Sequence, residues 1–165
     1  MNKETVFHKI DPVYDENCTI LLLGSMPSII SRQENFYYAN KTNRFWKVME
    51  EVFQTKSLMT IEDKKDFLLT NHIALWDVIK SCSIKGSSDN TIGEVVVNDI
   101  ETLIQKTKIK TIYTTGSTAK KYYDKYCLPK TKLQAIALPS TSAANAKYKL
   151  SDLIKCYEKI KINHK

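Results

Sequence analysis

The sequence predicts an α/β protein with a three-layer α/β/α architecture, in which a short four-stranded parallel sheet is flanked by helices. Apolar runs of about five residues alternate along the chain with segments of helical spacing. The runs are apolar at consecutive positions, which is typical of strands covered on both faces. With 165 residues and no repeat or low-complexity stretch, the chain fits a single domain over residues 1–165.

Four segments have strand character, and each ends at a residue that breaks it. The predicted strands are residues 18–23, 72–76, 110–115 and 133–138, followed by Gly24, Asp77, Gly116 and Pro139. The first, CTILLL, is the most apolar of them. Parallel strands bring their carboxyl ends to one edge of a sheet, and open α/β sheets bind ligands beyond that edge. We therefore expect the functional residues in the loops that follow these strands.

The segments of helical spacing supply the covering layers. Helices are predicted over residues 43–53, 61–69, 98–106, 117–126 and 147–160. Asn98 or Asp99 can cap the start of the third. Residues 25–42 form a polar, turn-rich segment, and residues 77–89 are expected to be a loop because they are rich in serine and glycine.

Charge and cysteine usage limit the classes of function. The net charge of +7, from 25 basic and 18 acidic residues, suits a phosphate-rich partner such as a nucleic acid. The longest apolar run, Ile20–Leu23, is too short to span a bilayer, and the first residues lack a signal core. Cys18, Cys82, Cys127 and Cys156 form no closely spaced pair, so we expect reduced thiols, no metal and no cofactor. A cytoplasmic monomer without membrane contact is the expectation.

Three segments have the composition of a binding site. Gly24–Ser28 (GSMPS) offers backbone N–H groups to a ligand, although a glycine after a strand, taken alone, is more often just a turn. Residues 36–46 (FYYANKTNRFW) combine aromatic rings, amides and cations, which suit a flat heterocycle attached to phosphate. There Phe45 and Trp46 are better interpreted as core. Residues 138–146 (LPSTSAANA) present hydroxyls suited to a phosphate, or form a turn in which Ser142 or Asn145 caps the last helix.

Taken in order, these segments resemble the motifs of the uracil-DNA glycosylase superfamily. The first two, GSMPS and YYANKTNRFW, are similar to the GSxPS and YYAHPxNxFW of its hypoxanthine-DNA glycosylase family. Residues 75–79 (LWDVI) with 86–89 (GSSD), and residues 138–146, resemble the middle and last motifs of that family. The resemblance implies a monofunctional DNA glycosylase of base-excision repair, which flips a deaminated base out of DNA and hydrolyses its N-glycosidic bond.

The resemblance also implies a role for individual residues. Tyr38 matches the ring that stacks on the flipped base, and Asn43 matches the asparagine implicated in catalysis. An amide can position a water molecule, and Asn43 can also cap the helix that follows it. The remaining base-binding candidates are Gly24, Ser25, Met26 and Thr115. The candidates for contact with DNA phosphates are Pro27, Ser28, Ser140, Thr141, Ser142 and Asn145.

Two carboxylates, Asp77 and Asp89, lie in reach of the expected site. They are interpreted either as a general-base pair or, with more weight, as groups that order their loops through Asx turns.

Departures from the family pattern leave alternatives open. Asn40-Lys41 stands where the family has His-Pro, and Thr115 stands where an amide is expected to read the base. A threonine hydroxyl discriminates less sharply than an amide, so a uracil or G/U-mismatch glycosylase is one alternative. A non-catalytic nucleic-acid-binding protein on the same fold is another. Histidine-based catalysis has few candidates, since the chain has only His8, His72 and His164.

Overall fold

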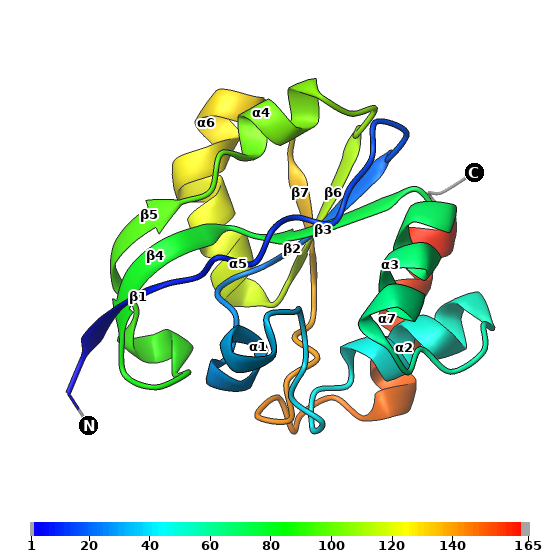
Figure 1. Ribbon diagram of the computed structural model, residues 1–165, viewed down its shortest axis with the longest axis horizontal. Coiled ribbons are helices and arrows are strands. Elements are labelled where there is room, and N and C mark those ends of the chain that lie inside the picture. The colour runs from blue at the N-terminus through cyan, green and yellow to red at the C-terminus, as the bar shows by residue number, and fades with distance from the viewer. Residues whose placement is uncertain (1, 163–165) are drawn as a thin grey trace.

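A parallel four-stranded sheet, in the order β3-β2-β6-β7, forms the centre of the molecule (Figure 1). The computed structural model describes residues 2–162, so His164 lies outside it. The strands are β2 (Ile20–Gly24), β3 (Ile73–Asp77), β6 (Thr111–Thr115) and β7 (Ala135–Leu138). They match the four predicted runs to within a few residues. The predicted fold class is confirmed.

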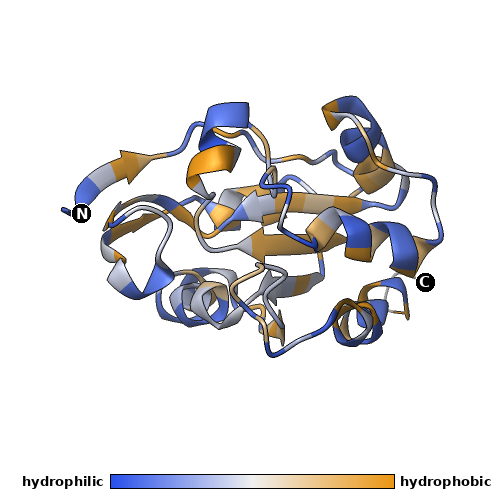
Figure 2. Ribbon diagram, turned by 90° about the horizontal axis from the view of Figure 1, so that it is seen from below, coloured by the Kyte–Doolittle hydropathy of each residue, from blue (hydrophilic) through white to orange (hydrophobic). Residues whose placement is uncertain are grey.

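Helices cover both faces of this sheet, and strand β2 shows why its residues are apolar throughout. Ile20 and Leu22 enter one hydrophobic cluster, whereas Leu21 and Leu23 enter the other. The first cluster packs beneath α2 (Phe45–Phe53), α3 (Ile61–Thr70) and α7 (Leu150–Ile162). The second packs beneath α4 (Ile100–Gln105), α5 (Ser117–Tyr122) and α6 (Leu128–Thr131). In Figure 2 the strands, largely in the colour of hydrophobic residues, run between helices that combine hydrophobic and hydrophilic residues.

A second sheet is the main feature that the sequence did not predict. It is antiparallel, with the order β1-β4-β5, and consists of β1 (Glu4–Phe7), β4 (Ile79–Ile84) and β5 (Gly93–Val97). The prediction of a loop over residues 77–89 was therefore wrong, because β4 occupies the first half of this segment. Serines within β4 suggested a loop, but pairing with β1 and β5 on both sides satisfies its backbone and stabilises the strand.

Several helix boundaries also differ from the prediction. The polar segment after Gly24 contains a short helix, α1 (Ile29–Glu34), whose N-cap is Ser28. The helix predicted over 117–126 continues through a π-helical turn (Tyr123–Cys127) into α6 and ends at Thr131. A short 3₁₀ turn spans Asp89–Thr91. Asp99 is the cap of α4, since its side chain accepts the N–H of Thr102.

The strand register places the ends of the parallel strands together. Gly24 at the end of β2 is paired with Asp77 at the end of β3. On the other side of the sheet, Thr115 at the end of β6 is paired with Leu138 at the end of β7. Within residues 2–162, no helix is both long and apolar enough to cross a membrane.

Candidate active site

A cavity of about 970 Å³ opens at the carboxyl ends of the parallel strands. Every residue that the sequence indicated for the site lines it: Gly24, Ser25, Met26, Pro27, Ser28, Tyr38, Asn43, Asp77, Asp89, Thr115, Ser140, Thr141, Ser142 and Asn145. These residues come from six separate segments of the chain. The structure therefore brings the separate motifs together at the edge of the sheet where ligands are expected.

Tyr38 is held rigidly, with one ring face against the core. Its ring stacks on that of Phe45 at a centroid distance of 4.0 Å and an angle of 12°. Its hydroxyl shares a 2.8 Å hydrogen bond with the hydroxyl of Thr115. The backbone of Tyr38 has a φ of 51°, a left-handed conformation that costs a non-glycine residue free energy and is typical of functional sites. Phe45 and Trp46 are buried, so their interpretation as core residues is confirmed.

The side chain of Asn43 has a fixed orientation. Its Oδ1 accepts the backbone N–H of Phe45 at 2.9 Å in an Asx turn, whereas the N-cap of α2 is Arg44, so the expectation that Asn43 caps this helix was wrong. The same oxygen accepts the hydroxyl of Thr141 at 2.8 Å, from a residue 98 positions away. A carbonyl oxygen has two lone pairs, and these two donors occupy them. Asn43 therefore offers the cavity its NH₂ group, which is a hydrogen-bond donor.

Thr141 accordingly has a role other than the expected phosphate contact. The residue is 1% exposed, and its hydroxyl is committed to Asn43. Thr141 thus orients the amide of Asn43 through this hydrogen bond. Thr115 is engaged in a comparable way, because its hydroxyl contacts Tyr38 and, at 3.4 Å, the backbone carbonyl of Leu23.

Arg44 fastens the loop of residues 138–148 to the start of α2. Its guanidinium group donates to four backbone carbonyls, those of Thr141, Ser142, Asn145 and Tyr148. The side chains of the loop add local ties, since Asn145 Nδ2 donates to Ser140 O and Ser142 Oγ accepts the N–H of Ala144. The last helix begins only at Leu150, so the alternative in which Ser142 or Asn145 caps it was wrong.

The Gly24–Ser28 loop forms the opposite wall. Ser28 Oγ accepts the N–H of Ser31 and so begins α1, while Ser31 Oγ accepts the N–H of Ala39, next to Tyr38. Ser25 Oγ donates to the carboxylate of Asp89 at 3.4 Å. A residue larger than glycine does not fit at position 24, because its Cβ would lie 2.4 Å from Asp77 Oδ1 and 3.0 Å from the Tyr38 hydroxyl.

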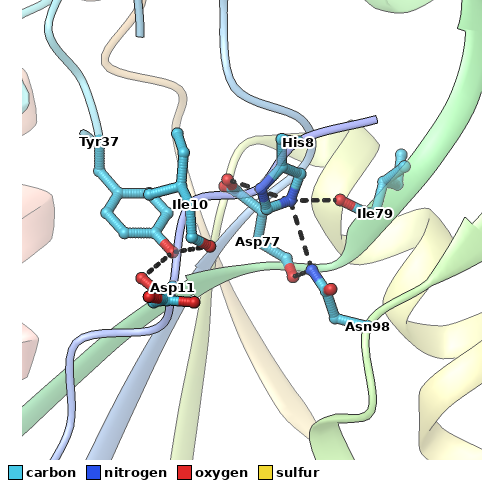
Figure 3. A network of polar contacts seen from close by, with 7 residues as sticks. All are labelled: His8, Ile10, Asp11, Tyr37, Asp77, Ile79 and Asn98. Atoms are coloured by element: carbon cyan, nitrogen blue, oxygen red, sulfur yellow. Dashed lines mark hydrogen bonds and ion pairs between the residues drawn. The ribbon is translucent and has the colours of Figure 1, made fainter. Parts of the chain in front are cut away.

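A buried polar network lies behind Asp77 (Figure 3). The Asp77 side chain is 5% exposed, and its Oδ2 lies 4.0 Å from His8 Nε2. That nitrogen donates to the carbonyl of Ile79 at 2.7 Å, and Asn98 Nδ2 donates to the carbonyl of Asp77 at 2.8 Å. Burial raises the pKa of Asp77 to about 8, and the charge of Asp89 adds to the shift. Burial also lowers the pKa of His8, so the histidine is neutral at pH 7.

His8 and Asn98 are the site residues that sequence reasoning missed. His8 lies near the start of the chain and 90 positions from Asn98, and only the unpredicted second sheet brings the two together. Sequence reasoning also could not assign the structural role of Arg44, because the sequence does not show which carbonyls surround its guanidinium group. Within the described part of the chain, no group of three His, Cys, Asp or Glu side chains could hold a metal ion.

A cavity that combines an aromatic ring with hydrogen-bonding groups is typical of enzymes that flip a base out of DNA. The family model of the uracil DNA glycosylase superfamily matches residues 12–163. The chain therefore belongs to the uracil DNA glycosylase superfamily, whose members hydrolyse N-glycosidic bonds.

Individual relatives narrow the comparison. A protein of Methanosarcina acetivorans named hypoxanthine DNA glycosylase is 36% identical over 138 residues, which are 82% of this chain and 86% of that protein. One of the same name from Methanosarcina barkeri is 32% identical over 93 residues, 56% of this chain and 59% of that one. The solution NMR structure of a Methanosarcina acetivorans protein, described as a candidate uracil DNA glycosylase, has a TM-score of 0.78 at 32% identity. It covers 96% of this chain and 99% of its own.

The raised pKa of Asp77 predicts that this residue lowers stability at neutral pH. Above the ordinary aspartate pKa of about 3.9, the unfolded chain releases a proton that the folded chain retains until about pH 8. The free energy of unfolding contributed by Asp77 therefore falls as the pH rises through this window. Asp77→Asn should be more stable than the wild type by about 2–4 kcal/mol near pH 7, and little different near pH 4. Urea unfolding at pH 4 and pH 7 measures the free energy of unfolding of each variant. Asp66 is an exposed carboxylate on α3, so Asp66→Asn is the control and should leave the free energy of unfolding unchanged at both pH values.

The four carbonyl contacts of Arg44 predict that its geometry matters more than its charge. Arg44→Lys keeps the charge but cannot reach the same four carbonyls, so it should lower the free energy of unfolding by about 2 kcal/mol. Hydrogen exchange of the amides of residues 140–148 should accelerate in the same variant. Arg44→Met is the matched comparison. If lysine fully preserved both stability and exchange protection while methionine did not, charge alone would explain the role of Arg44.

Proposed function

We propose that this chain removes hypoxanthine from DNA by hydrolysing the N-glycosidic bond between the deaminated base and deoxyribose. The observation that carries the proposal is the meeting, in one cavity, of a rigid stacking ring (Tyr38), a fixed amide (Asn43) and a hydroxyl-rich loop (residues 138–146). The choice of base is supported by the relative that is 36% identical and named hypoxanthine DNA glycosylase.

The geometry suggests how a flipped base is held. The base stacks on the free face of Tyr38, whose other face is supported by Phe45. Asn43 directs its NH₂ group, and backbone N–H groups of Ser25 and Met26 are further donors for the edge of the base. Because the hydroxyl of Thr115 is bonded to Tyr38, we assign it the positioning of the ring and not the reading of the base.

The phosphates beside the lesion are assigned to the two walls of the cavity. One wall carries Pro27 and Ser28, and the other carries Ser140, Ser142 and Asn145. Lys147 also lines the cavity and supplies positive charge there, since the guanidinium group of Arg44 is committed to backbone carbonyls. We propose that the chain acts in this way as a cytoplasmic monomer without a cofactor.

Removal of the Asn43 amide should abolish most base release. Purified protein is incubated with end-labelled duplexes that carry one deoxyinosine or one deoxyuridine, and abasic sites are then cleaved with alkali. We expect scission at deoxyinosine, reduced by about 100-fold or more in Asn43→Ala because a donor in a preorganised site is lost. Asn17→Ala, which changes an exposed asparagine outside the cavity, should behave as the wild type.

Other outcomes of this assay distinguish the alternatives. Scission mainly at deoxyuridine would keep the enzyme class and contradict the assignment to hypoxanthine. Salt-sensitive binding of both duplexes without any scission would indicate a non-catalytic DNA-binding protein. Scission that is unchanged in Asn43→Ala would contradict the role of Asn43.

A further inference from the structure

Asp77 presents an unusual carboxyl group to the floor of the cavity. The residue ends strand β3 and is 4% exposed. Its Oδ1 lies where a side chain of Gly24 would be, only 2.4 Å from the position of a Cβ on that glycine. Its Oδ2 is fully buried, and no hydrogen-bond partner for it exists among residues 2–162. The expected Asx turn is therefore not formed by this residue, and the side chain has no evident role in ordering its loop.

The groups that face Asp77 favour the neutral carboxylic acid. His8 lies behind it, but burial lowers the pKa of the histidine, so it carries no charge at pH 7. Tyr37 and Tyr38 are neutral, because burial raises the pKa of both phenols. The charge of Asp89 also acts on Asp77 and disfavours a second negative charge. None of these groups is a cation that would stabilise a carboxylate.

We propose that Asp77 is the general acid of the reaction, giving its proton to a ring nitrogen of the leaving purine from the oxygen that faces the cavity beside Gly24. This inference rests on the proposed release of hypoxanthine. As the bond between C1′ and N9 breaks, its electron pair goes to the purine, and the proton from Asp77 neutralises the departing base. Water forms the new bond to C1′, and the proton that it loses restores the acid, directly or through solvent.

The other groups of the site explain why the reaction needs a proton from Asp77. The amide of Asn43 donates hydrogen bonds but is not an acid, so it cannot neutralise a leaving purine. The burial that holds the pKa of Asp77 at about 8 keeps its proton available at neutral pH, close to the pKa at which a general acid is most effective. A positioned acid of this kind typically contributes about 10²–10⁴-fold in rate.

The experiment is the pH dependence of hypoxanthine release with enzyme in excess over a duplex carrying one deoxyinosine, from about pH 6 to about pH 10. For the wild type, we expect a rate that is level below about pH 8 and falls by about tenfold per unit above it. Asp77→Asn keeps the shape of the side chain but carries no acidic proton. It should be slower by about 100-fold below pH 8 and should lack the alkaline fall. Asp66→Asn should keep both the rate and the fall.

Measurements of DNA binding and of thermal unfolding distinguish a general acid at position 77 from a residue with a structural role alone. Asp77→Asn should bind a duplex with an abasic-site analogue as tightly as the wild type, and thermal unfolding should show it at least as stable. A variant that releases hypoxanthine at the wild-type rate, or with the same alkaline fall, would overturn the assignment. So would a wild type whose rate stays level up to about pH 10. A wild type that releases no hypoxanthine at any pH would instead contradict the proposed function, and the acid with it.

Discussion

The constraint around which this site is arranged is a buried carboxyl group, that of Asp77, which has no ion pair with a lysine or arginine among residues 2–162. A carboxylate at the position of Asp77 would cost several kcal/mol in desolvation, so the folded state retains the proton. The neighbours conform to this requirement: Gly24 leaves the space, His8 stays neutral with its Nε2–H on a carbonyl, and the tyrosines remain phenols. A group that lowers stability at neutral pH persists most readily where activity needs it.

A second set of contacts joins segments that are distant in the sequence into one wall. Thr141 reaches the amide of Asn43, and Arg44 reaches the carbonyls of the same loop, so the start of α2 and residues 138–148 behave as one unit. The guanidinium fork suits several carbonyls at once, which an ammonium group cannot match. The cationic side chain next to Asn43 in the sequence, that of Arg44, thus has a structural role. The chain has a net charge of +7, and basic residues other than Arg44 therefore attract DNA.

The sequence predicted the parts of the molecule that depend on local pattern. Consecutive apolar residues in β2 identified a strand covered on both faces, and the loops after the strands proved to share one cavity. The second sheet was missed because β4 is rich in serine and is stabilised by pairing with β1 and β5, which no local pattern records. The roles of His8 and Thr141 depend on contacts between residues that are 70 or more positions apart in the sequence. Such contacts follow from the packing of the whole chain.

The orientation of Asn43 changes the mechanism expected from the sequence alone. An asparagine that positions water through its carbonyl oxygen needs a free lone pair, and here Phe45 and Thr141 occupy both. Asn43 can therefore stabilise negative charge or hold an acceptor through its NH₂ group, but it cannot accept a proton from water. Because Asn43 cannot activate water, its own contribution has to lie in assisting the departure of the base. In the reaction that we propose, a rigid stacking ring, a donor amide and a protonated carboxyl around one cavity all act on that same step.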